Sequence, residues 1–417
     1  MSHEPTHAAI HAVWRIERPR LIAGLARLVR DVGLAEDLAQ DALVVALERW
    51  PSSGVPDRPA AWLMAAAKHK ALDRLRRRRM VARKHEQIAG EQAIEPFTVP
   101  DHEAALDDEV GDDLLRLIFV ACHPVLPTEA RTALTLRLLG GLTTPEIARA
   151  FLVPEPTIAQ RIVRAKRTLA KAKVPFEVPR GPELAARLES VLEVVYLIFN
   201  EGYAATAGDD LTRPALCAEA LRLGRILAGL ASAEPEVHGL VALMELQASR
   251  LHARIGPDGA PVLLPDQDRR RWDHLLIRRG LAALARAEAQ GGAAGVYALQ
   301  AAIAACHARA VRAENTDWTR IAALYAVLAR VTSSPVVELN RAVAVGMAAG
   351  PAAGLALVDD LVAGGALERY HLLPSVRGDL LAKLGRTEEA RVEFLRAASL
   401  TRNASEQAFL RRRAVAP

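Results

Sequence analysis

Residues 142–167 read LTTPEIARAFLVPEPTIAQRIVRAKR, and this stretch decides the fold of the chain around it. Its first part carries apolar residues at helical spacing, at Ile147, Ala148 and Phe151. Thr144 is placed to cap such a helix, and Pro145 occupies the first turn, where its missing N–H costs no hydrogen bond. The sequence therefore predicts a short helix that begins at Thr144.

A tight turn and a second helix follow. Pro154 and Pro156 prevent one continuous helix, and Thr157 begins the second element. The inner face of this helix is apolar, formed by Ile158, Ile162, Ala165 and Leu169. The outer face carries Gln160, Arg161, Arg164, Arg167 and Lys171. The pattern predicts a helix-turn-helix, in which Arg and Gln of the second helix read base edges in the major groove. An ordinary helical hairpin with a solvated charged face is the alternative.

The composition indicates several helical domains. The chain has 417 residues, of which 51% are apolar and 4% aromatic, and Ala, Leu and Arg dominate. This length is too great for one small domain, and the apolar content allows sizeable cores. Since strands prefer β-branched and aromatic residues, we expect an all-α protein.

Cysteine usage and hydropathy indicate the compartment. Cys122, Cys217 and Cys306 lie far apart and are predicted to be buried thiols in a reducing cytoplasm. The pairs Cys122-His123 and Cys306-His307 have no second ligand at zinc spacing, so we expect no metal site and no cofactor. No signal pattern and no apolar run of about 18 residues occurs, and we expect a cytoplasmic protein that does not enter a membrane.

Charge is distributed in blocks. The formal net charge is +5, but Lys and Arg concentrate in residues 68–84 and 161–173, and residues 86–113 contain many acids and no Lys or Arg. Two cationic blocks separated by an acidic spacer indicate two contacts with a polyanion.

An acidic helix is predicted over residues 35–50, before a Pro/Ser/Gly loop at 51–59. Polar residues lie away from its apolar side, at Glu36, Asp37, Gln40, Asp41 and Glu48. This face suits docking to a basic partner. A plain solvated helix, whose N-terminal acids favour the helix dipole, explains it equally well.

The next helix begins near Ala60 and runs into the arginine cluster at 76–79. Leu72 and Leu75 belong to the core, and the arginines project from it. Because dense like charges repel one another, phosphates are expected nearby. A solvated basic tail is the alternative.

The last third of the chain repeats itself. Small and large residues at Gly378, Leu381, Ala390, Phe394 and Ala397 follow tetratricopeptide spacing, and the pattern recurs at Ala342, Val345, Gly354, Val358 and Leu361. A weaker copy lies at Ala302, Ala305, Trp318, Ile321 and Tyr325. We expect stacked helical hairpins with a concave binding face.

These features together resemble the extracytoplasmic-function class of bacterial sigma factors. The resemblance rests on AEDLAQD at 35–41, on the run from Trp62-Leu63 to Ala71-Leu72-Asp73-Arg74-Leu75-Arg76-Arg77, and on the helix-turn-helix. The phrases VYLIFNEGY at 195–203 and LPDQDR at 264–269 resemble the subgroup with a long tetratricopeptide-like C-terminal extension.

The resemblance implies a domain order. Residues 1–85 would be sigma region 2, 86–112 an acidic flexible linker, and 113–174 sigma region 4 with the helix-turn-helix. Residues 175–182 would be a Pro-rich linker and 183–417 a helical-repeat regulatory domain.

The resemblance also implies partners and contact residues. Core RNA polymerase would be contacted at its β′ clamp helices and β flap, with Asp37, Gln40, Asp41 and Trp50 on the side of this chain. The −10 promoter element would be opened by the 51–58 loop and held by Trp62, Lys68, His69, Lys70, Arg74, Arg76 and Arg77. The −35 element would be read by Thr157, Gln160, Arg161, Arg164 and Arg167, with Lys171 on phosphate.

No catalytic arrangement is expected. The acid pairs at 107–108 and 112–113 lie in a predicted linker or helix cap, and no nucleotide-binding or metalloprotease motif occurs. Asn200-Glu201-Gly202-Tyr203, followed by Asp209-Asp210, is interpreted as a helix end with Gly202 at its C-cap, and a polar site is the alternative.

Two other functions stay open at this level. One is a regulator that binds duplex DNA without polymerase and senses a ligand or peptide through its repeats. The other is an interaction scaffold. The C-terminal half could inhibit the DNA-binding part, be required for its activity, or recruit a further protein.

Overall fold

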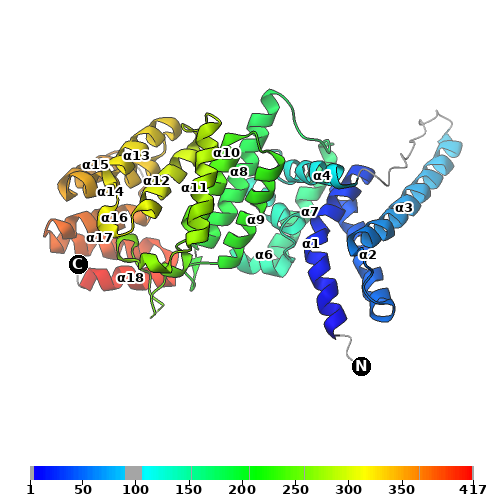
Figure 1. Cartoon of the computed structure of the whole chain (residues 1–417), viewed down its shortest axis with the longest axis horizontal. Helices are drawn as coiled ribbons and strands as arrows, with labels where there is room; N and C mark the ends of the chain where they lie inside the picture. The colour runs from blue at the N-terminus through cyan, green and yellow to red at the C-terminus, as the bar shows by residue number, and fades with distance from the viewer. Residues whose placement is uncertain are drawn as a thin grey trace. The chain divides into compact units, whose positions relative to one another are not determined.

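The computed structural model describes residues 4–89, 106–151, 153–205, 207–257, 259–365 and 367–415. Helices make up nearly all of the regular structure in this part of the chain (Figure 1). Contacts divide the chain into an N-terminal unit, Met1–Val194, and a C-terminal unit, Val195–Pro417. The division falls inside helix α8 and not in the predicted linker at 175–182.

Among the described residues of the N-terminal unit, seven helices precede α8, and their bounds are α1 Glu4–Val29, α2 Val32–Ser53, α3 Pro59–Ala89, α4 Leu106–Ala121, α5 Thr128–Leu138, α6 Thr144–Phe151 and α7 Glu155–Lys171. Helix α1 packs on α2, α3 and α4, and α7 packs on α5 and α6. Fully buried side chains at these contacts include Ile22, Leu38 and Leu63. Burying such apolar faces holds helices that would be marginal alone.

The acidic segment after α3 has more helix than predicted. Helix α3 continues to Ala89, and α4 already begins at Leu106, so helix enters the predicted linker from both ends. The middle of that linker, residues 90–105, lies outside the described residues.

The loop before α3 is shorter than predicted, because α2 continues through Pro51 to Ser53. The N–H of Gly54 then bonds to the carbonyl oxygen of Trp50 at 2.9 Å and closes the last turn. Gly54 has φ +80°, a backbone conformation that glycine adopts without strain.

The first turns of α8 (Pro182–Tyr203) belong to the N-terminal unit. Arg187 Nη2 donates to the carbonyl oxygen of Phe119 at 2.9 Å, and Ser190 Oγ donates to that of Cys122 at 2.6 Å. These bonds satisfy two carbonyl groups at the end of α4, where an α-helix leaves acceptors unpaired.

Where the structure describes it, the C-terminal unit continues with ten helices and two short strands, whose bounds are β1 Ala207–Gly208, α9 Pro214–Leu230, α10 Pro235–Ala248, α11 His274–Ala289, α12 Val296–Arg309, α13 Trp318–Thr332, α14 Pro335–Ala349, α15 Pro351–Ala363, α16 Leu372–Lys383, α17 Thr387–Leu400, β2 Arg402–Asn403 and α18 Ala404–Val415. Short 3₁₀ turns occur at Leu251–Ala253, Leu264–Asp266, Arg269–Arg271 and Ala313–Asn315.

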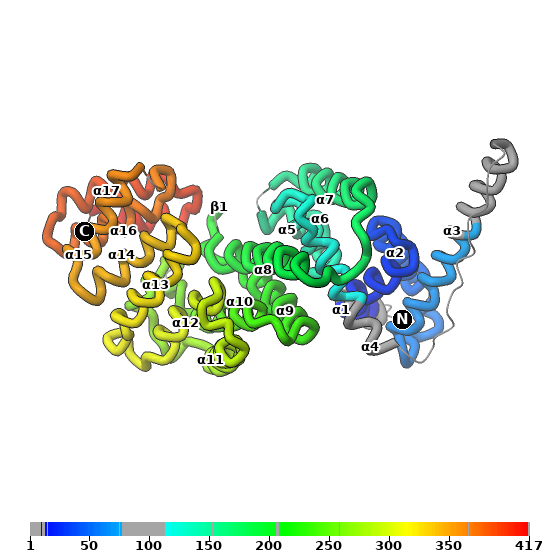
Figure 2. Tube along the Cα trace, turned by 90° about the horizontal axis from the view of Figure 1, so that it is seen from above, coloured from blue at the N-terminus to red at the C-terminus, as the bar shows by residue number. Residues whose placement is uncertain are grey.

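The repeat pattern corresponds to helical hairpins. Helices α14 and α15 pack together, as do α16 and α17, and each pair lies side by side in both views (Figures 1 and 2). Gly378 of α16 permits close approach to α17, because a Cβ at this position would lie 3.0 Å from the ring of Phe394. The hairpins are therefore observed, although no match identifies them as tetratricopeptide repeats.

Glycine at position 202 has a different role from the one predicted. Gly202 lies inside α8 and is buried, and a Cβ there would lie 2.6 Å from the backbone nitrogen of Cys217 in α9. The helix does end at Tyr203 as expected, but Gly202 serves the contact between two helices and is not a C-cap.

All three cysteines are buried free thiols. Burial raises the pKa of Cys122 to about 11 and that of Cys217 to about 12, so neither is a reactive thiolate at neutral pH. Among the described residues no helix is both long and apolar enough to pass through a bilayer, and no cluster of His, Cys, Asp and Glu could ligate a metal ion.

Candidate nucleic-acid and polymerase interface

The helix-turn-helix is present, and its first helix is capped one residue earlier than predicted. Glu146 Oε2 accepts from the N–H of Thr143 at 2.7 Å, and Thr143 Oγ1 accepts from the N–H of Glu146 at 3.4 Å. This reciprocal pairing is a capping box with Thr143 as the N-cap, so Thr144 is the first helical residue and not the cap.

The second helix, α7, presents two distinct faces. Ile158, Ile162, Ala165 and Leu169 are buried, which confirms the predicted inner face. The helix starts at Glu155, two residues before the predicted Thr157. Pro154 at the N-cap and Pro156 in the first turn are tolerated there, because the N–H groups that proline lacks have no partner within the helix at these positions. Thr157 is half-buried within the first turn.

The outer face of α7 is polar and accessible. Gln160, Arg164, Arg167 and Lys171 are exposed, and Arg161 is half-buried. In the part of the chain that the structure describes, Arg161, Arg164 and Arg167 form no ion pair. Their guanidinium groups are therefore available for phosphates or base edges.

The distribution of exposed and buried residues on the acidic helix α2 differs from the prediction. Asp37 and Gln40 are exposed and Asp41 is half-buried, so these three lie on an accessible edge. Trp50 is only 1% exposed and packs edge-to-face on Trp62, with the ring centroids 5.3 Å apart. Trp50 is thus a core residue that supports the end of α2, and its predicted contact with polymerase is not accessible here.

Helix α3 places several predicted DNA-binding cations on the surface. Lys68, His69, Arg74 and Arg76 are exposed, and Arg76 lies 3.9 Å from Asp73 on the same helix. Lys70 Nζ donates to the carbonyl oxygen of Asp41 at 3.4 Å and thereby ties α3 to α2. Trp62 is half-buried, and the side chain of Arg77 lies outside the described residues.

A buried ion cluster that the sequence did not predict centres on Glu36. This carboxylate is 2% exposed, and cations from three other helices surround it. Its Oε1 accepts from Arg18 of α1 at 2.8 Å and from Arg137 of α5 at 2.7 Å. Its Oε2 lies 2.5 Å from Nζ of Lys166 on α7, the second helix of the helix-turn-helix. The cluster links α2 to the helix-turn-helix.

Electrostatics keeps Glu36 ionised in this cluster. Burial alone would raise the pKa of Glu36, but the charges of Lys166, Arg137 and Arg18 lower it overall. A second buried acid is paired between α1 and α4, where Asp113 Oδ2 lies 3.1 Å from Nε of Arg27.

The position of Glu36 on its helix could have identified it as buried. Glu36 lies three residues before Ala39 and fourteen before Trp50, so all three share the buried side of α2. An acid at such a position has to be paired, although the sequence does not say with which cations.

The residues that form this surface match known families. Residues 14–80 match the family Sigma-70 region 2, and residues 116–169 match Sigma-70, region 4. The RNA polymerase sigma-H factor of Pseudomonas aeruginosa is 30% identical over 164 residues, which cover 38% of this chain and 82% of that protein. The ECF RNA polymerase sigma factor SigK of a Mycobacterium species (strain KMS) is 30% identical over 158 residues, 37% of this chain and 77% of the relative.

The chain belongs to the extracytoplasmic-function sigma factors. It is therefore a non-enzymatic factor that binds core RNA polymerase and promoter DNA and directs promoter-specific transcription initiation. This confirms the sigma-factor function predicted from the sequence over the core-independent regulator and the scaffold, and the modulating role of the C-terminal half stays a prediction.

The C-terminal half of this sigma factor has relatives of unassigned role. Residues 187–288 match a family described only as being of unknown function, DUF6596. An uncharacterised protein of Rhizobium meliloti is 45% identical over 400 residues, which cover 94% of this chain and 92% of that protein. No solved structure matches the chain.

Proposed function

We propose that the accessible edge of α2 formed by Asp37, Gln40 and Asp41 docks this sigma factor on the β′ clamp helices of core polymerase. The three residues are spaced i, i+3 and i+4, so their side chains are neighbours on one helix face. Asp37 has no ion pair among the described residues, and its charge is available to a basic partner. Trp50 acts indirectly by holding the helix end against Trp62.

The −10 element is assigned to α3 and the loop that precedes it. Lys68, His69 and Arg74 are exposed on α3, and residues 54, 55, 57 and 58 of the preceding loop are exposed as well. A loop next to a cationic helix can accept an extruded base and hold the phosphates of the released strand. Lys70 and Arg76 extend this cationic surface, and Arg77 stays a prediction from the sequence.

The −35 element is assigned to the outer face of α7. The N-terminal residues of a recognition helix reach base edges, which favours Thr157, Gln160, Arg161 and Arg164 as readers of sequence. Arg167 and Lys171 lie further along the helix and suit phosphate contacts. The β flap is the expected polymerase partner of this domain.

The Glu36 cluster implies that the free sigma factor has to open. Promoter elements centred roughly 25 base pairs apart are separated by about 85 Å along the duplex. Helix α2 packs on α3, which is assigned to the −10 element, so the contact between Glu36 on α2 and Lys166 on α7 cannot persist when α3 and α7 occupy their elements. We therefore expect core binding to break this ion cluster.

The C-terminal unit is assigned a modulating role. The Pro-rich segment at 175–182 leads from the helix-turn-helix into α8, and the second half of α8 begins the C-terminal unit. Such a short connection keeps the local concentration high. Comparing reporter output from the full chain with that of a chain ending after Val194 distinguishes inhibition from requirement. This end point keeps Arg187 and Ser190, which bond to the end of α4. Equal output would contradict modulation, and recruitment of a further protein would then be the remaining role.

The exposure of Asp37 and Gln40 beside the buried Glu36 is the observation that carries the docking assignment. The experiment measures co-elution of the full chain with bacterial core polymerase. Asp37→Arg combined with Asp41→Arg is expected to abolish the complex. Glu129→Arg with Glu177→Arg makes the same change in charge at two exposed acids elsewhere and is expected to leave it intact. Loss of binding in both double variants, or in neither, would contradict the assignment.

A further inference from the structure

The C-terminal unit contains a cavity whose walls come from distant parts of the chain. Its volume is about 280 Å³, just below the range of about 300–1,000 Å³ typical of drug-sized ligands, so it suits a small molecule. The walls are formed by the end of α8, the segment 250–267 and the first turns of α16 and α18. The residues that matter for its chemistry are Tyr203, Arg250, Arg254, Gln267, His371 and Glu406.

Hydrogen bonds fix these walls relative to one another. Strand β1 pairs in parallel with β2, with Gly208 opposite Asn403. Asn403 Nδ2 donates to the carbonyl oxygens of Ala205 at 3.3 Å and Asp210 at 2.9 Å. Ser405 Oγ donates to that of Asp209 at 2.6 Å. The cavity is thus built where the beginning and the end of the C-terminal unit are joined.

Two guanidinium groups line the cavity and lack a carboxylate partner. Arg254 Cζ lies 3.9 Å from the centroid of the Tyr203 ring, and Arg250 Cζ lies 5.5 Å from it. Neither arginine forms an ion pair with any residue that the structure describes. Both are partly buried, and a cation removed from water without a counter-charge is costly.

Three buried polar atoms around these cations also have no hydrogen-bond partner in the described part of the chain. They are Tyr203 Oη, Arg254 Nε and Gln267 Oε1. Tyr203 is 8% and Gln267 7% exposed, so water does not readily replace the missing bonds. Unpaired buried polar groups are rare in folded proteins and indicate an absent partner.

The charge balance selects the kind of anion. Glu406 Oε2 lies 3.2 Å from Nε2 of His371 in the same wall. Burial alone would raise the pKa of Glu406, but His371, Thr401 and Arg254 lower it overall, so it is ionised at neutral pH. The two guanidinium groups and this one carboxylate together leave a single excess positive charge. A monoanion balances that charge, whereas a dianionic phosphate leaves an unpaired negative charge.

The remaining wall is apolar, formed by Pro261, Val262, Leu264, Phe409 and Leu410. We propose that this cavity binds a small organic monocarboxylate, with its carboxylate at Arg250 and Arg254 and its apolar part against this wall. Arg250 and Arg254 are binding residues in this assignment, and the Tyr203 hydroxyl supplies a neutral donor. Since the ligand contacts both ends of the C-terminal unit, its binding stabilises the contact between these ends.

The test uses the full-length protein without polymerase, so its outcome is independent of the docking assignment. Isothermal titration is carried out with hexanoate, benzoate, phenyl phosphate and the neutral hexanamide. We expect hexanoate or benzoate to bind at least tenfold more tightly than hexanamide and to raise the melting temperature. Arg254→Gln is expected to weaken this binding at least tenfold. Arg270→Gln removes an exposed arginine that pairs with Asp268 and is expected to have no effect.

Folding of the variants is checked by circular dichroism. If Arg254→Gln fails to fold, Arg250→Gln and Tyr203→Phe test the same surface with smaller changes, and both are expected to weaken carboxylate binding. Three results would overturn the proposal: carboxylates that bind no more tightly than hexanamide, binding that survives the variants, or phenyl phosphate binding more tightly than both carboxylates.

Discussion

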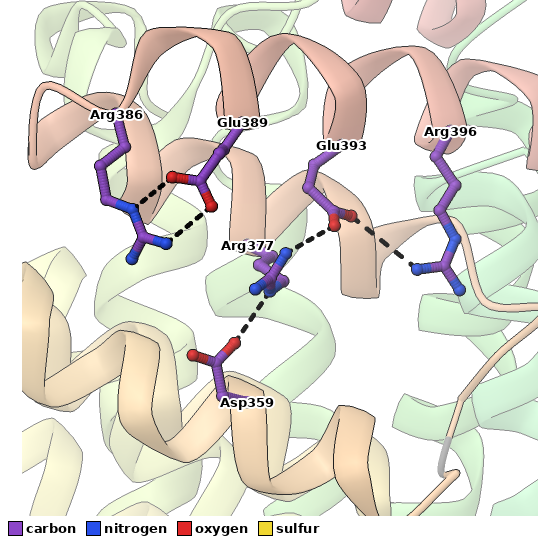
Figure 3. A network of polar contacts seen from close by, with 6 residues as sticks. All are labelled: Asp359, Arg377, Arg386, Glu389, Glu393 and Arg396. Atoms are coloured by element: carbon purple, nitrogen blue, oxygen red, sulfur yellow. Dashed lines mark hydrogen bonds and ion pairs between the residues drawn. The ribbon is translucent and has the colours of Figure 1, made fainter.

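Helix α7 and the hairpin α16–α17 carry similar numbers of arginines but use them in opposite ways. In the hairpin, Arg377 of α16 bridges Asp359 of α15 and Glu393 of α17 at 2.8 and 2.7 Å (Figure 3). Arg386 pairs with Glu389 at 2.7 Å in the same group of polar contacts. On α7, by contrast, Arg161, Arg164 and Arg167 have no such partner within the described residues.

The difference separates arginines that hold the fold from arginines that serve a ligand. The two acids hold Arg377 between three helices. Burial alone would lower the pKa of Arg377, but the two acids raise it overall. An arginine without a partner contributes little to stability and keeps its donors for phosphate, base or carboxylate. By this criterion we assign the arginines of α7 and the cavity arginines Arg250 and Arg254 to binding, and Arg377 of the α16–α17 hairpin to the stability of the fold.

The largest effect is expected on α7. Arg161→Gln combined with Arg164→Gln should weaken promoter binding by the holoenzyme, because each base-contacting arginine contributes about 1–3 kcal/mol. The melting temperature of the free protein should not change, since neither side chain has an ion pair to lose among the described residues. Filter binding and thermal melting measure the two quantities. A double variant with a lower melting temperature but normal promoter binding would contradict the assignment of these two arginines to DNA binding.

The next effect concerns two adjacent acids of α2. Glu36→Gln leaves Arg18, Arg137 and Lys166 without their shared carboxylate and should lower the free energy of unfolding of the N-terminal unit by about 3 kcal/mol. Asp37→Asn at the exposed neighbouring position should change it by less than about 0.5 kcal/mol. Urea unfolding of the two single variants makes the comparison. Equal destabilisation would mean that Glu36 is not the centre of a buried cluster.

The same cluster predicts a pH dependence. Because the folded-state pKa of Glu36 is lowered, its contribution to stability is fully present above the unfolded-state pKa of about 4.3 and is lost as the pH falls through the lower folded-state value. The melting-temperature difference between the wild type and Glu36→Gln should therefore be constant near neutral pH and shrink below about pH 4. A difference that grew in acid would contradict the sign of this linkage.

A smaller effect is expected in the hairpin. Arg377→Gln should lower stability by about 1 kcal/mol, since the side chain is partly buried and bonds to two helices. Arg386→Gln removes an exposed pair within one helical turn and should produce no measurable change. Neither variant should alter promoter binding, which the filter-binding assay checks. A loss of promoter affinity in Arg377→Gln would break the division between structural and binding arginines.

Local patterns in the sequence predicted much of the structure of α7 and its two faces. Helical spacing was sufficient to assign Ile158, Ile162 and the rest of the inner face of α7, because amphipathicity repeats within one element. The ion cluster was not predictable, since Arg137 and Lys166 lie far along the chain from Glu36 and only the tertiary fold joins them. Gly202 was misassigned for the same reason, because its contact is with Cys217 in another helix.

The assignment of α7 as the reader of the −35 element is tested most directly by selecting promoters from a randomised duplex library with core polymerase and the full-length protein. We expect two enriched sequence blocks with the wild type, and loss of the upstream block alone with Arg161→Gln and Arg164→Gln. Arg377→Gln should retain both blocks. An upstream block that persists in the α7 variant, or enrichment by the protein without core, would contradict the account.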